Sequence, residues 1–596
     1  SFPTRRSSDL TEIGNKTVYL FSRKHGDMER DYNAFNIPST YFSSGNGNYR
    51  DINQNRRNDL YISPSIKDDN VYLFFSLIEG NGFNPLLVNT TLLDKNYASF
   101  DDALKAIKGK DFSHISADYV EGYWIDHFVY NYDLLENYLS IYPDKEEELF
   151  FTKKYRYYDS WIHIKPRNKR YVLTSDNKIR QYDCLERIEG LTSHYLLDNN
   201  HQEIVTDLSS KIFSLISLKL SYLDVNQMGI EMSSNKPGWN DSCNGLPGLF
   251  GSSMNETIEL LRLAKLYLNV MKKHQKDVEI VKPLKSLIDV IINNDLDGFN
   301  YWNIVNTEKE GYEESYRFST LITIPNDEVI TILNHFISIL ESSIERSISL
   351  NDGVIPTYFS QEVQTYHMDN GVVVDSFKTH VLPNFLEAPA RLAKLGKTYF
   401  KKEQIDKINQ SELFDKELKV FRTSCSLNNE SKELGRICSF NPGWLERESD
   451  FIHMTFKYLL GLIKGGYFQE FFDKALTNIP CFMDPSIYGR SIFENVSFIS
   501  TSVHPNKDIH GQGFYARLTG ANSEIIDMQY SLLFGEHLFS LNEDGLTIDV
   551  HPHIPISLFK DDKIVISLFK DIRVIFLNKN KRDYNQQNNI TYLIND

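Results

Sequence analysis

The sequence predicts a mainly α-helical protein, in which a long series of helix pairs can close into a toroid and a small β-rich segment follows. Leu, Ile and Phe recur at three- and four-residue spacing through much of residues 203–420, as they do in helices that bury one face. Polar, glycine-containing stretches recur between these helices and indicate loops. After about residue 540 the apolar residues come in short runs that are typical of β-strands.

The expected elements follow in chain order. Residues 134–139 have helical apolar spacing, and residues 150–182 form a β excursion or a long loop. An amphipathic helix is expected over 203–222. Further helices are expected at about 256–273, 278–293, 326–350, 386–398 and 402–420, from about 453 to 462, and from about 523. Strands are expected at 546–550, 563–568 and 574–577. The chain has no repeat of 33 or 34 residues, which disfavours an open solenoid.

The first ten residues, SFPTRRSSDL, lack the apolar core of a signal peptide. They resemble the translation of a sequencing adapter, so we expect residues 1–10 to be an artefact on a chain that is cut at its N-terminus. We expect residues 11–540 to form one helical catalytic domain and residues 541–596 to form a C-terminal β-domain.

Composition argues against several classes of protein. The 596-residue chain has a dispersed net charge of −16 and no basic patch, so nucleic-acid binding is not expected. No run approaches 18 apolar residues, so no membrane-spanning helix is expected. The five cysteines include no CxxC pair, which indicates reduced thiols in the cytoplasm and neither a disulfide framework nor a zinc site.

The loop at residues 236–248 is the strongest candidate for a functional site. It is too rich in polar residues, Gly and Pro for a helix or a core strand, and it carries Asp241 two residues after Trp239. A sugar ring has an apolar face that packs on an indole and a rim of hydroxyls that needs hydrogen-bond partners. The pair can therefore supply a sugar platform and a proton donor. The alternative is a tight turn between helices, with Asp241 as a capping residue.

Four further polar segments add to this loop. They are Arg50-Asp51-Ile52-Asn53-Gln54, Asp126-His127-Phe128, Phe440-Asn441-Pro442-Gly443-Trp444-Leu445-Glu446 with His453, and Thr519-Gly520. Taken singly, each has a structural explanation, such as an ion pair, a helix cap or a helix-entry turn. Because all four occur in this order along one chain, together they are stronger evidence for a functional site than any one of them alone.

Together the motifs resemble those of the inverting phosphorylases of the cellobiose phosphorylase type, glycoside hydrolase family 94, and more closely the related β-1,3-glucan phosphorylases of families 149 and 161. The similarity covers roughly residues 20–540. It implies an (α/α)6 barrel flanked by β-sandwich domains, here a C-terminal β-sandwich-like domain, and a homodimer at full length. It also implies reversible phosphorolysis of β-glucan oligosaccharides to α-glucose 1-phosphate, with inorganic phosphate as co-substrate and no metal or organic cofactor.

The resemblance implies a role for each matching residue. Asp241 would be the general acid. The sugar-binding residues would be Trp239, Arg50, Asp51, Asp59, Asp126 and Glu446. The phosphate-binding residues would be His453, Thr519, Gly520 and Arg517.

The chain departs from the family pattern on the sugar side. Leu445 and Phe440 replace a Lys and a Tyr, so the acceptor contacts must differ from those to cellobiose. Asn55 replaces an Asp, which leaves either Asp51 or Asp59 as the donor-site carboxylate. The linkage that is cleaved, β-1,3, is implied by the resemblance alone.

The chain also departs on the phosphate side. The upstream arginine that binds phosphate in the family has no counterpart in residues 40–48. One of Arg56, Arg57 and Arg517 would take its place.

Phosphorolysis suits a site with a single acid. Asp241 would have to be protonated when substrate is bound, whereas phosphate is already an anion and needs only positive charge and donors. An inverting hydrolase needs a second carboxylate as base, for which Glu446 or Glu448 is the candidate. An inverting β-glucan hydrolase is therefore the second hypothesis, and an inactive glycan-binding fragment is the third.

Overall fold

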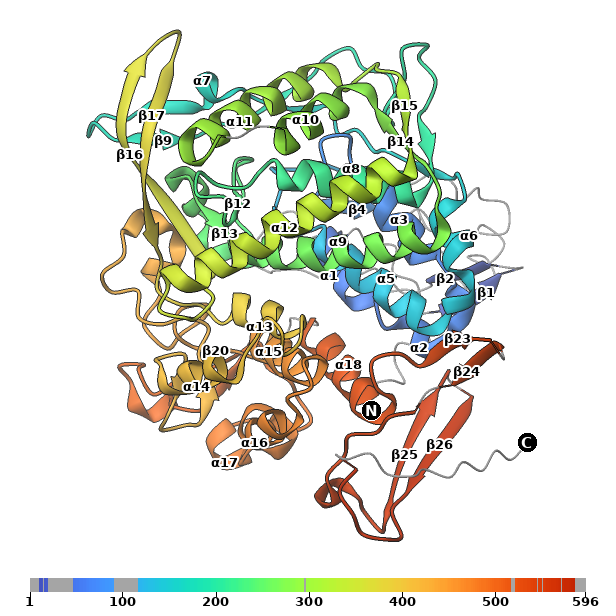
Figure 1. The fold of residues 1–596 in the computed structure, drawn as a ribbon. Helices are drawn as coiled ribbons and strands as arrows, with labels where there is room; N and C mark the ends of the chain where they lie inside the picture. The colour runs from blue at the N-terminus through green and yellow to red at the C-terminus, as the bar shows by residue number, and fades with distance from the viewer. Residues whose placement is uncertain are drawn as a thin grey trace, which may run out of the picture.

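The computed structural model describes residues 10–13, 16–19, 47–89, 116–293, 296–515, 520–543, 545–548, 550–569 and 571–584. Over these residues the chain is mainly helical and its antiparallel sheets are small (Figure 1), as the sequence predicts. None of the helices described combines the length and the hydrophobicity that crossing a bilayer requires. All five cysteines are free thiols.

The helices fall into three groups along the chain. The first group is α1 Tyr49–Arg56, α2 Asp59–Ile62, α3 Asp69–Ser76, α5 Val129–Ile141 and α6 Glu146–Phe151. The second group is α7 Arg167–Arg170, α8 Leu208–Leu220, α9 Met254–His274, α10 Lys282–Ile292, α11 Gly298–Ser315 and α12 Asn326–Leu350. The third group is α13 Glu387–Ala393, α14 Lys402–Gln410, α15 Ile452–Lys464, α16 Phe468–Asn478, α17 Pro485–Tyr488 and α18 Gly520–Phe534.

Apart from β16 and β17 the described strands are short, and all of them pair antiparallel within their sheets. The first are β1 Leu10–Ile13, β2 Lys16–Tyr19, β3 Gly47–Asn48, β4 Leu87–Asn89, β5 Ser116–Asp118, β6 Tyr155–Arg156, β7 Ile162–Ile164, β8 Tyr171–Leu173, β9 Ile179–Gln181, β10 Leu185–Arg187, β11 Val205–Thr206, β12 Ile230–Glu231 and β13 Ser252–Ser253. The others are β14 Val278–Val281, β15 Leu321–Ile324, β16 Tyr358–Met368, β17 Val372–Val381, β18 Phe414–Asp415, β19 Val420–Phe421, β20 Asp450–Phe451, β21 Phe498–Ile499, β22 Gly513–Phe514, β23 Phe539–Asn542, β24 Gly545–Ile548, β25 Lys563–Leu568 and β26 Ile572–Leu577. The largest sheets are β12-β13-β16-β17, β3-β4-β5 and β20-β21-β22.

The long periodic helices are confirmed, whereas the bounds of three predicted helices are wrong in part, among them 386–398, since α13 ends at Ala393. The helix predicted over 326–350 is α12, whose apolar face packs against α9. The prediction over 278–293 is wrong at its start, because β14 pairs there with β15 and Pro283 fixes the first turn of α10. The prediction over 402–420 is wrong beyond the end of α14, where β18 and β19 follow. The β excursion predicted over 150–182 is confirmed by β6 to β9.

The amphipathic helix predicted over 203–222 is wrong in its exposure. It corresponds to α8, and every residue of α8 is buried, including two lysines. Lys211 donates from Nζ to the carbonyl oxygen of Ile78 over 2.9 Å. Lys219 places Nζ 3.7 Å from the centroid of the Phe83 ring. The polar side chains of α8 therefore find their partners inside the protein, and α8 is a central helix.

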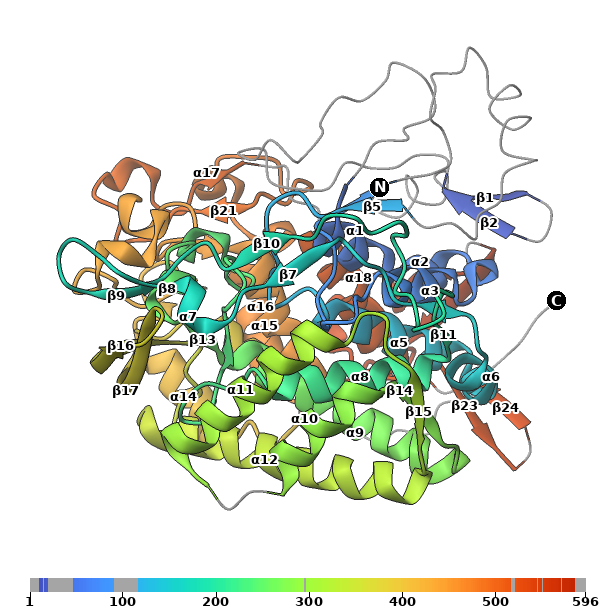
Figure 2. The ribbon, with the colours of Figure 1, turned by 90° about the horizontal axis from the view of Figure 1, so that it is seen from above.

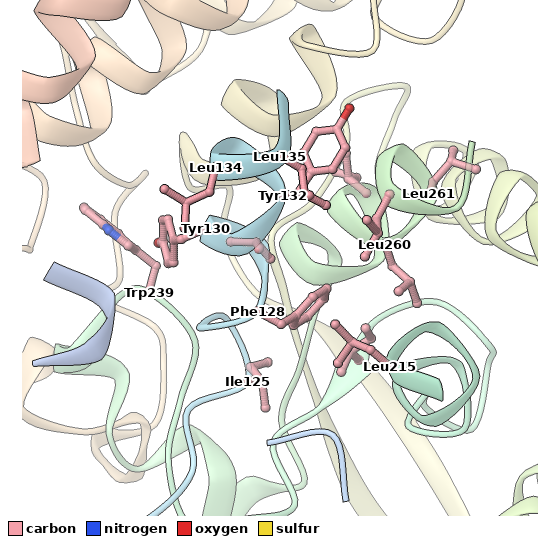
Figure 3. Packing of buried hydrophobic residues seen from close by; sticks show 14 of the residues in the cluster. Ile125, Phe128, Tyr130, Tyr132, Leu134, Leu135, Leu215, Trp239, Leu260 and Leu261 are labelled. Carbon is pink, nitrogen blue, oxygen red and sulfur yellow. The ribbon is translucent and has the colours of Figure 1, made fainter. Parts of the chain in front are cut away.

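The core lies around α8, α9 and the start of α5. In Figure 2 the helices α10, α11 and α12 lie along one side of the molecule. Figure 3 shows part of the core, with Ile125 and Phe128 at the start of α5, Leu215 from α8 and Leu260 from α9. Several elements were not predicted from the sequence, among them α11, α16 and the long hairpin β16–β17, which projects from the body in Figure 1.

The strands predicted near the C-terminus correspond to β24, β25 and β26. They form two separate hairpins, β23–β24 and β25–β26. Phe576 of β26 packs against Phe534 of α18, with ring centroids 5.8 Å apart. The β-rich segment is thus attached to the last long helix.

Candidate active site

The loop that carries Asp241 is built by local hydrogen bonds and by one close approach. Asn240 precedes a short 3-10 turn, and its side-chain oxygen accepts from the backbone N–H of Ser242 over 3.1 Å. At Gly245 a Cβ atom would lie 1.9 Å from the carbonyl oxygen of Glu433, so only glycine lets the two segments touch. The turn therefore packs directly against the segment that leads to Glu446.

Both carboxylate oxygens of Asp241 are held by donors from distant segments. Arg50 in α1 places Nη2 2.8 Å from Oδ2, and Trp124 donates from Nε1 to Oδ1 over 2.8 Å. Asp241 is buried, with 8 % of its surface exposed. The ion pair with a buried guanidinium favours the ionised form of this carboxyl group. The Asp241 side chain thus contacts Arg50 and Trp124, and the N-cap of the following turn is Asn240.

Arg50 also joins Asp241 to a second carboxylate. Its Nη1 lies 3.4 Å from Oδ2 of Asp126 and donates to the carbonyl oxygen of Trp239 over 3.2 Å. Burial opposes the cation, but Asp241 and Asp126 raise the pKa of Arg50 well above its ordinary value. The arginine is thus a fixed positive charge between two acids.

Asp126 precedes α5 and faces inward. Burial raises its pKa above the ordinary value, and Arg50 opposes that shift. Tyr130 donates to its Oδ2 over 3.1 Å, while Oδ1 is buried and makes no hydrogen bond within the described residues. The predicted N-cap alternative for Asp126 is not observed, because Phe128 occupies the N-cap position of α5.

Trp239 and His453 form the other side of the site. The Trp239 ring lies 4.8 Å from Phe451 and 5.6 Å from the His453 ring, centroid to centroid. Burial, aided by Lys457, lowers the pKa of His453 to about 3, so the imidazole is neutral near pH 7. Its Nε2 lies 3.3 Å from the Glu524 carboxylate, which can only accept a hydrogen bond. Nε2 therefore carries the proton and Nδ1 is an acceptor.

Gly520 opens α18 directly against this histidine. A Cβ atom at Gly520 would lie 2.2 Å from Cε1 and 2.7 Å from Nδ1 of His453. The close approach of the helix to the ring explains the glycine without any ligand. Thr519 and Arg517, the other predicted phosphate-binding residues on this side, lie outside the described residues.

A buried ionic cluster contacts His453 through Glu524. Glu524 pairs with Arg57 at 2.7 Å and with Lys457 at 2.8 Å. Burial opposes ionisation, but Arg57 and Lys457 hold the pKa of Glu524 well below its ordinary value. Arg57 also contacts Asp527 and Asp133, at 3.0 and 3.3 Å. Because three carboxylates surround it, Arg57 serves this cluster, and it does not point to a phosphate site.

The remaining predicted residues lie at different places. Asp51 is 4.0 Å from Nε of Arg50, a longer contact than the one Arg50 makes to Asp241. Asp59 opens α2, whereas Arg50 lies in the first turn of α1, about 9 Å of helix before its end. Asp51 is therefore adjacent to Arg50, and Asp59 belongs to a different helix.

The two glutamates weighed as hydrolytic bases have different surroundings. Glu446 lies 3.8 Å from Arg436, and together with Asp241 it contributes to raising the pKa of the Cys243 thiol, after burial. Burial raises the pKa of Glu448, which pairs with Arg447 at 3.3 Å. Of the two, Glu446 is the one placed near the loop that carries Asp241, because its partner Arg436 donates from its backbone N–H to the Asn244 side chain over 3.0 Å.

Sequence reasoning missed several direct partners of the site, namely Trp124, Tyr130 and Glu524. Trp124 lies two residues before Asp126 in the sequence. Its contact with Asp241 depends on hydrogen bonds between residues 123–125 and residues 234–237, which form only in the folded chain. Tyr130, one helical turn after Asp126, could have been found from that spacing. Glu524 follows Gly520 by four residues, one turn of α18, and could have been considered with it.

The described residues contain no group of three or more His, Cys, Asp and Glu side chains that is suited to hold a metal ion. In the comparisons with known proteins, the chain matches no protein-family model and no curated protein.

Proposed function

We propose that this protein is an inverting glycoside phosphorylase that acts on β-glucan oligosaccharides, with β-1,3 linkages, on an (α/α)6 barrel. The observation that carries the proposal is the Asp241 carboxylate, which is held by Trp124 and by Arg50, while Arg50 also donates to the carbonyl oxygen of Trp239. Residues from four distant segments meet there, as the resemblance implies. We also propose a cytoplasmic enzyme that is a homodimer at full length, with phosphate as its co-substrate.

The chemistry needs one proton on one carboxyl group. In phosphorolysis a phosphate oxygen bonds to the anomeric carbon while the glycosidic C–O bond breaks, and Asp241 gives its proton to the departing oxygen. Attack from the opposite face converts a β-linkage into an α-sugar 1-phosphate. In the reverse direction the Asp241 carboxylate accepts the proton of the attacking hydroxyl group. The Arg50 ion pair favours the carboxylate, so synthesis is the direction to measure first.

The phosphate side fits a neutral histidine. With its Nε2–H turned to Glu524, His453 offers Nδ1 as an acceptor, and a hydrogen phosphate ion carries one P–O–H donor to match it. Positive charge for the phosphate would come from Arg517, and a hydrogen bond would come from the Thr519 hydroxyl group, as predicted from the sequence.

The test is phosphate release from α-glucose 1-phosphate with laminaribiose, cellobiose or glucose as acceptor. We expect release that depends on the acceptor, is fastest with laminaribiose and disappears in Asp241→Asn. Asp375→Asn, on the exposed β17 strand, is the matched control and should keep full activity. Circular dichroism would establish that both variants fold.

Other outcomes would exclude the proposal. Release of glucose from laminari-oligosaccharides in phosphate-free buffer, without phosphate release in the first assay, would indicate the hydrolase. Activity that survives Asp241→Asn would remove Asp241 from the mechanism.

A further inference from the structure

A ladder of aromatic rings leads away from the Asp241 loop. Strands β20, β21 and β22 pair in register, so that Phe451, Phe498 and Phe514 are cross-strand neighbours. Their ring centroids lie 4.4 and 5.5 Å apart. Trp239 touches the Phe451 end at 4.8 Å, and Trp444 touches the Phe514 end at 3.7 Å. The ladder therefore fixes Trp444 relative to the Asp241 loop.

Trp444 is the outer end of this ladder and is partly exposed. Its indole lies parallel to the Phe514 ring, with 8° between the planes, so Phe514 packs on one face. The His504 ring, tilted by 53° at 5.6 Å, contacts it as well. The exposed part of Trp444 therefore lies outside the area that these two rings cover.

The turn that carries Trp444 is rigid. Backbone hydrogen bonds between Trp444 and Arg447 close it in both directions, at 3.1 and 3.2 Å. Leu445 adopts a left-handed backbone conformation, with φ of 51°, which costs free energy in a non-glycine residue and persists where the surroundings impose it. Arg447 ties the turn to the carbonyl oxygens of Cys438 and Phe440. The indole is thus held in a fixed orientation before any ligand binds.

We propose that Trp444 is a sugar-binding platform on the acceptor side, which binds a glucose unit of the oligosaccharide beyond the reacting one. This inference rests on the proposed function for the class of ligand. An indole backed by an aromatic ring offers a flat apolar surface to the C–H face of a pyranose. Glu446, two residues further along the same turn, can accept hydrogen bonds from its hydroxyl groups. Oligosaccharide acceptors therefore gain binding that glucose lacks.

The test compares acceptors of different length in Trp444→Ala and Trp444→Phe. With α-glucose 1-phosphate as donor, we expect Trp444→Ala to raise the KM for laminaripentaose about tenfold, and far more than the KM for glucose. Trp444→Phe, which keeps a ring, should fall between it and the wild type. Tyr366→Ala, which removes a partly exposed ring of β16, is the matched control and should follow the wild type with every acceptor. An unchanged KM for laminaripentaose in Trp444→Ala, or an equal loss with all acceptors, overturns the platform.

Calorimetry with laminaripentaose alone separates this inference from the proposed function. If the wild type binds the oligosaccharide, Trp444→Ala loses that binding and Tyr366→Ala keeps it, the platform stands even where no phosphate is released. If the wild type does not bind, or Trp444→Ala binds equally well, the platform is wrong although phosphorolysis can still be right.

Discussion

Gly520 illustrates how one residue ties a helix to the candidate site. The α18 backbone comes so close to His453 that a methyl group has no room. The imidazole ring cannot move aside easily, because its Nε2 is bonded to the buried Glu524. The glycine was expected from the sequence to serve phosphate, and packing against His453 gives it a sufficient structural reason of its own.

We expect Gly520→Ala to lower the free energy of unfolding by about 1–3 kcal/mol, the usual cost of overpacking. In a His453→Ala background the added methyl group should cost far less, because the ring that it meets is gone. Gly311→Ala is the matched control, since nothing lies within 4 Å of its Cβ in α11, and it should stabilise by roughly 0.5–1 kcal/mol. Urea unfolding measures all of these, and an equal cost of Gly520→Ala in both backgrounds would contradict the explanation.

The site residues that the motifs predicted are those whose side-chain type alone indicates a chemical role. Asp241, Trp239, Arg50 and Asp126 could be named because an acid, an aromatic ring and an ion pair are what a sugar site needs, and they do meet. Trp124 could not be named, because its N–H acquires a role only when residues 123–125 pair with the loop.

At the scale of elements, the Glu524 cluster joins three helices. Glu524 belongs to α18, its partner Lys457 to α15, and Arg57 follows α1 directly. All three side chains are almost fully buried. Removal of one charge from such a cluster leaves the opposite charges uncompensated in a medium that solvates them poorly.

We expect Glu524→Gln to destabilise the protein by about 3–5 kcal/mol, because Lys457 and Arg57 lose their shared carboxylate. The matched control is Glu470→Gln. It breaks the pair with Lys402 at 2.9 Å on the surface, where such pairs contribute less than about 1 kcal/mol. Chemical denaturation of both variants gives the comparison, and a small effect of Glu524→Gln would show that the cluster does not hold the helices together.

Two of the helices show what the spacing of apolar residues in the sequence can predict. The helix α12 was predicted with its observed bounds because one face is polar along its whole length. The helix α8 was predicted in position but not in exposure, since sequence periodicity cannot tell a solvated lysine from one whose ammonium reaches a buried carbonyl group. The hairpin β16–β17 was missed, because the outer part of β16 has exposed residues on both faces and so lacks the alternation of a half-buried strand.

At the scale of the whole molecule, buried acids set the dependence of stability on pH. Burial raises the pKa of Glu79 and Glu256 to about 8 and the pKa of Glu313, Glu387 and Asp450 to about 7. In the unfolded chain these groups ionise near pH 4. Between about pH 5 and 7 the folded protein therefore holds protons that the unfolded chain has lost, so stability falls as the pH rises.

Buried basic side chains limit this decline in stability. Burial lowers the pKa of Lys219, Lys309 and Lys457 to about 7. Above about pH 7 these lysines are neutral in the folded protein but still protonated in the unfolded chain. In that range they make stability rise with pH. Burial also lowers the pKa of four histidines, His127, His163, His453 and His553, which act in the same direction below about pH 6.5, but these four stand against the five acids. The net fall should thus be steepest between about pH 5 and 7.

We expect the Tm of the wild type to fall across that range, and Glu256→Gln to flatten the curve. An amide has no proton to lose, so the variant should match the wild type near pH 5. A pKa difference of about 1 between the folded and the unfolded chain corresponds to about 1.4 kcal/mol, so at pH 8.5 the variant should be more stable than the wild type by at least about 2 kcal/mol. Glu189→Gln, at an exposed site with a side chain that is 89 % accessible, should follow the wild type throughout. Thermal melts at pH 5, 7 and 8.5 decide between these outcomes. A wild-type Tm that rises from pH 5 to 7 would mean that the buried acids are ionised in the folded protein, with cations closer to them than the structure places them.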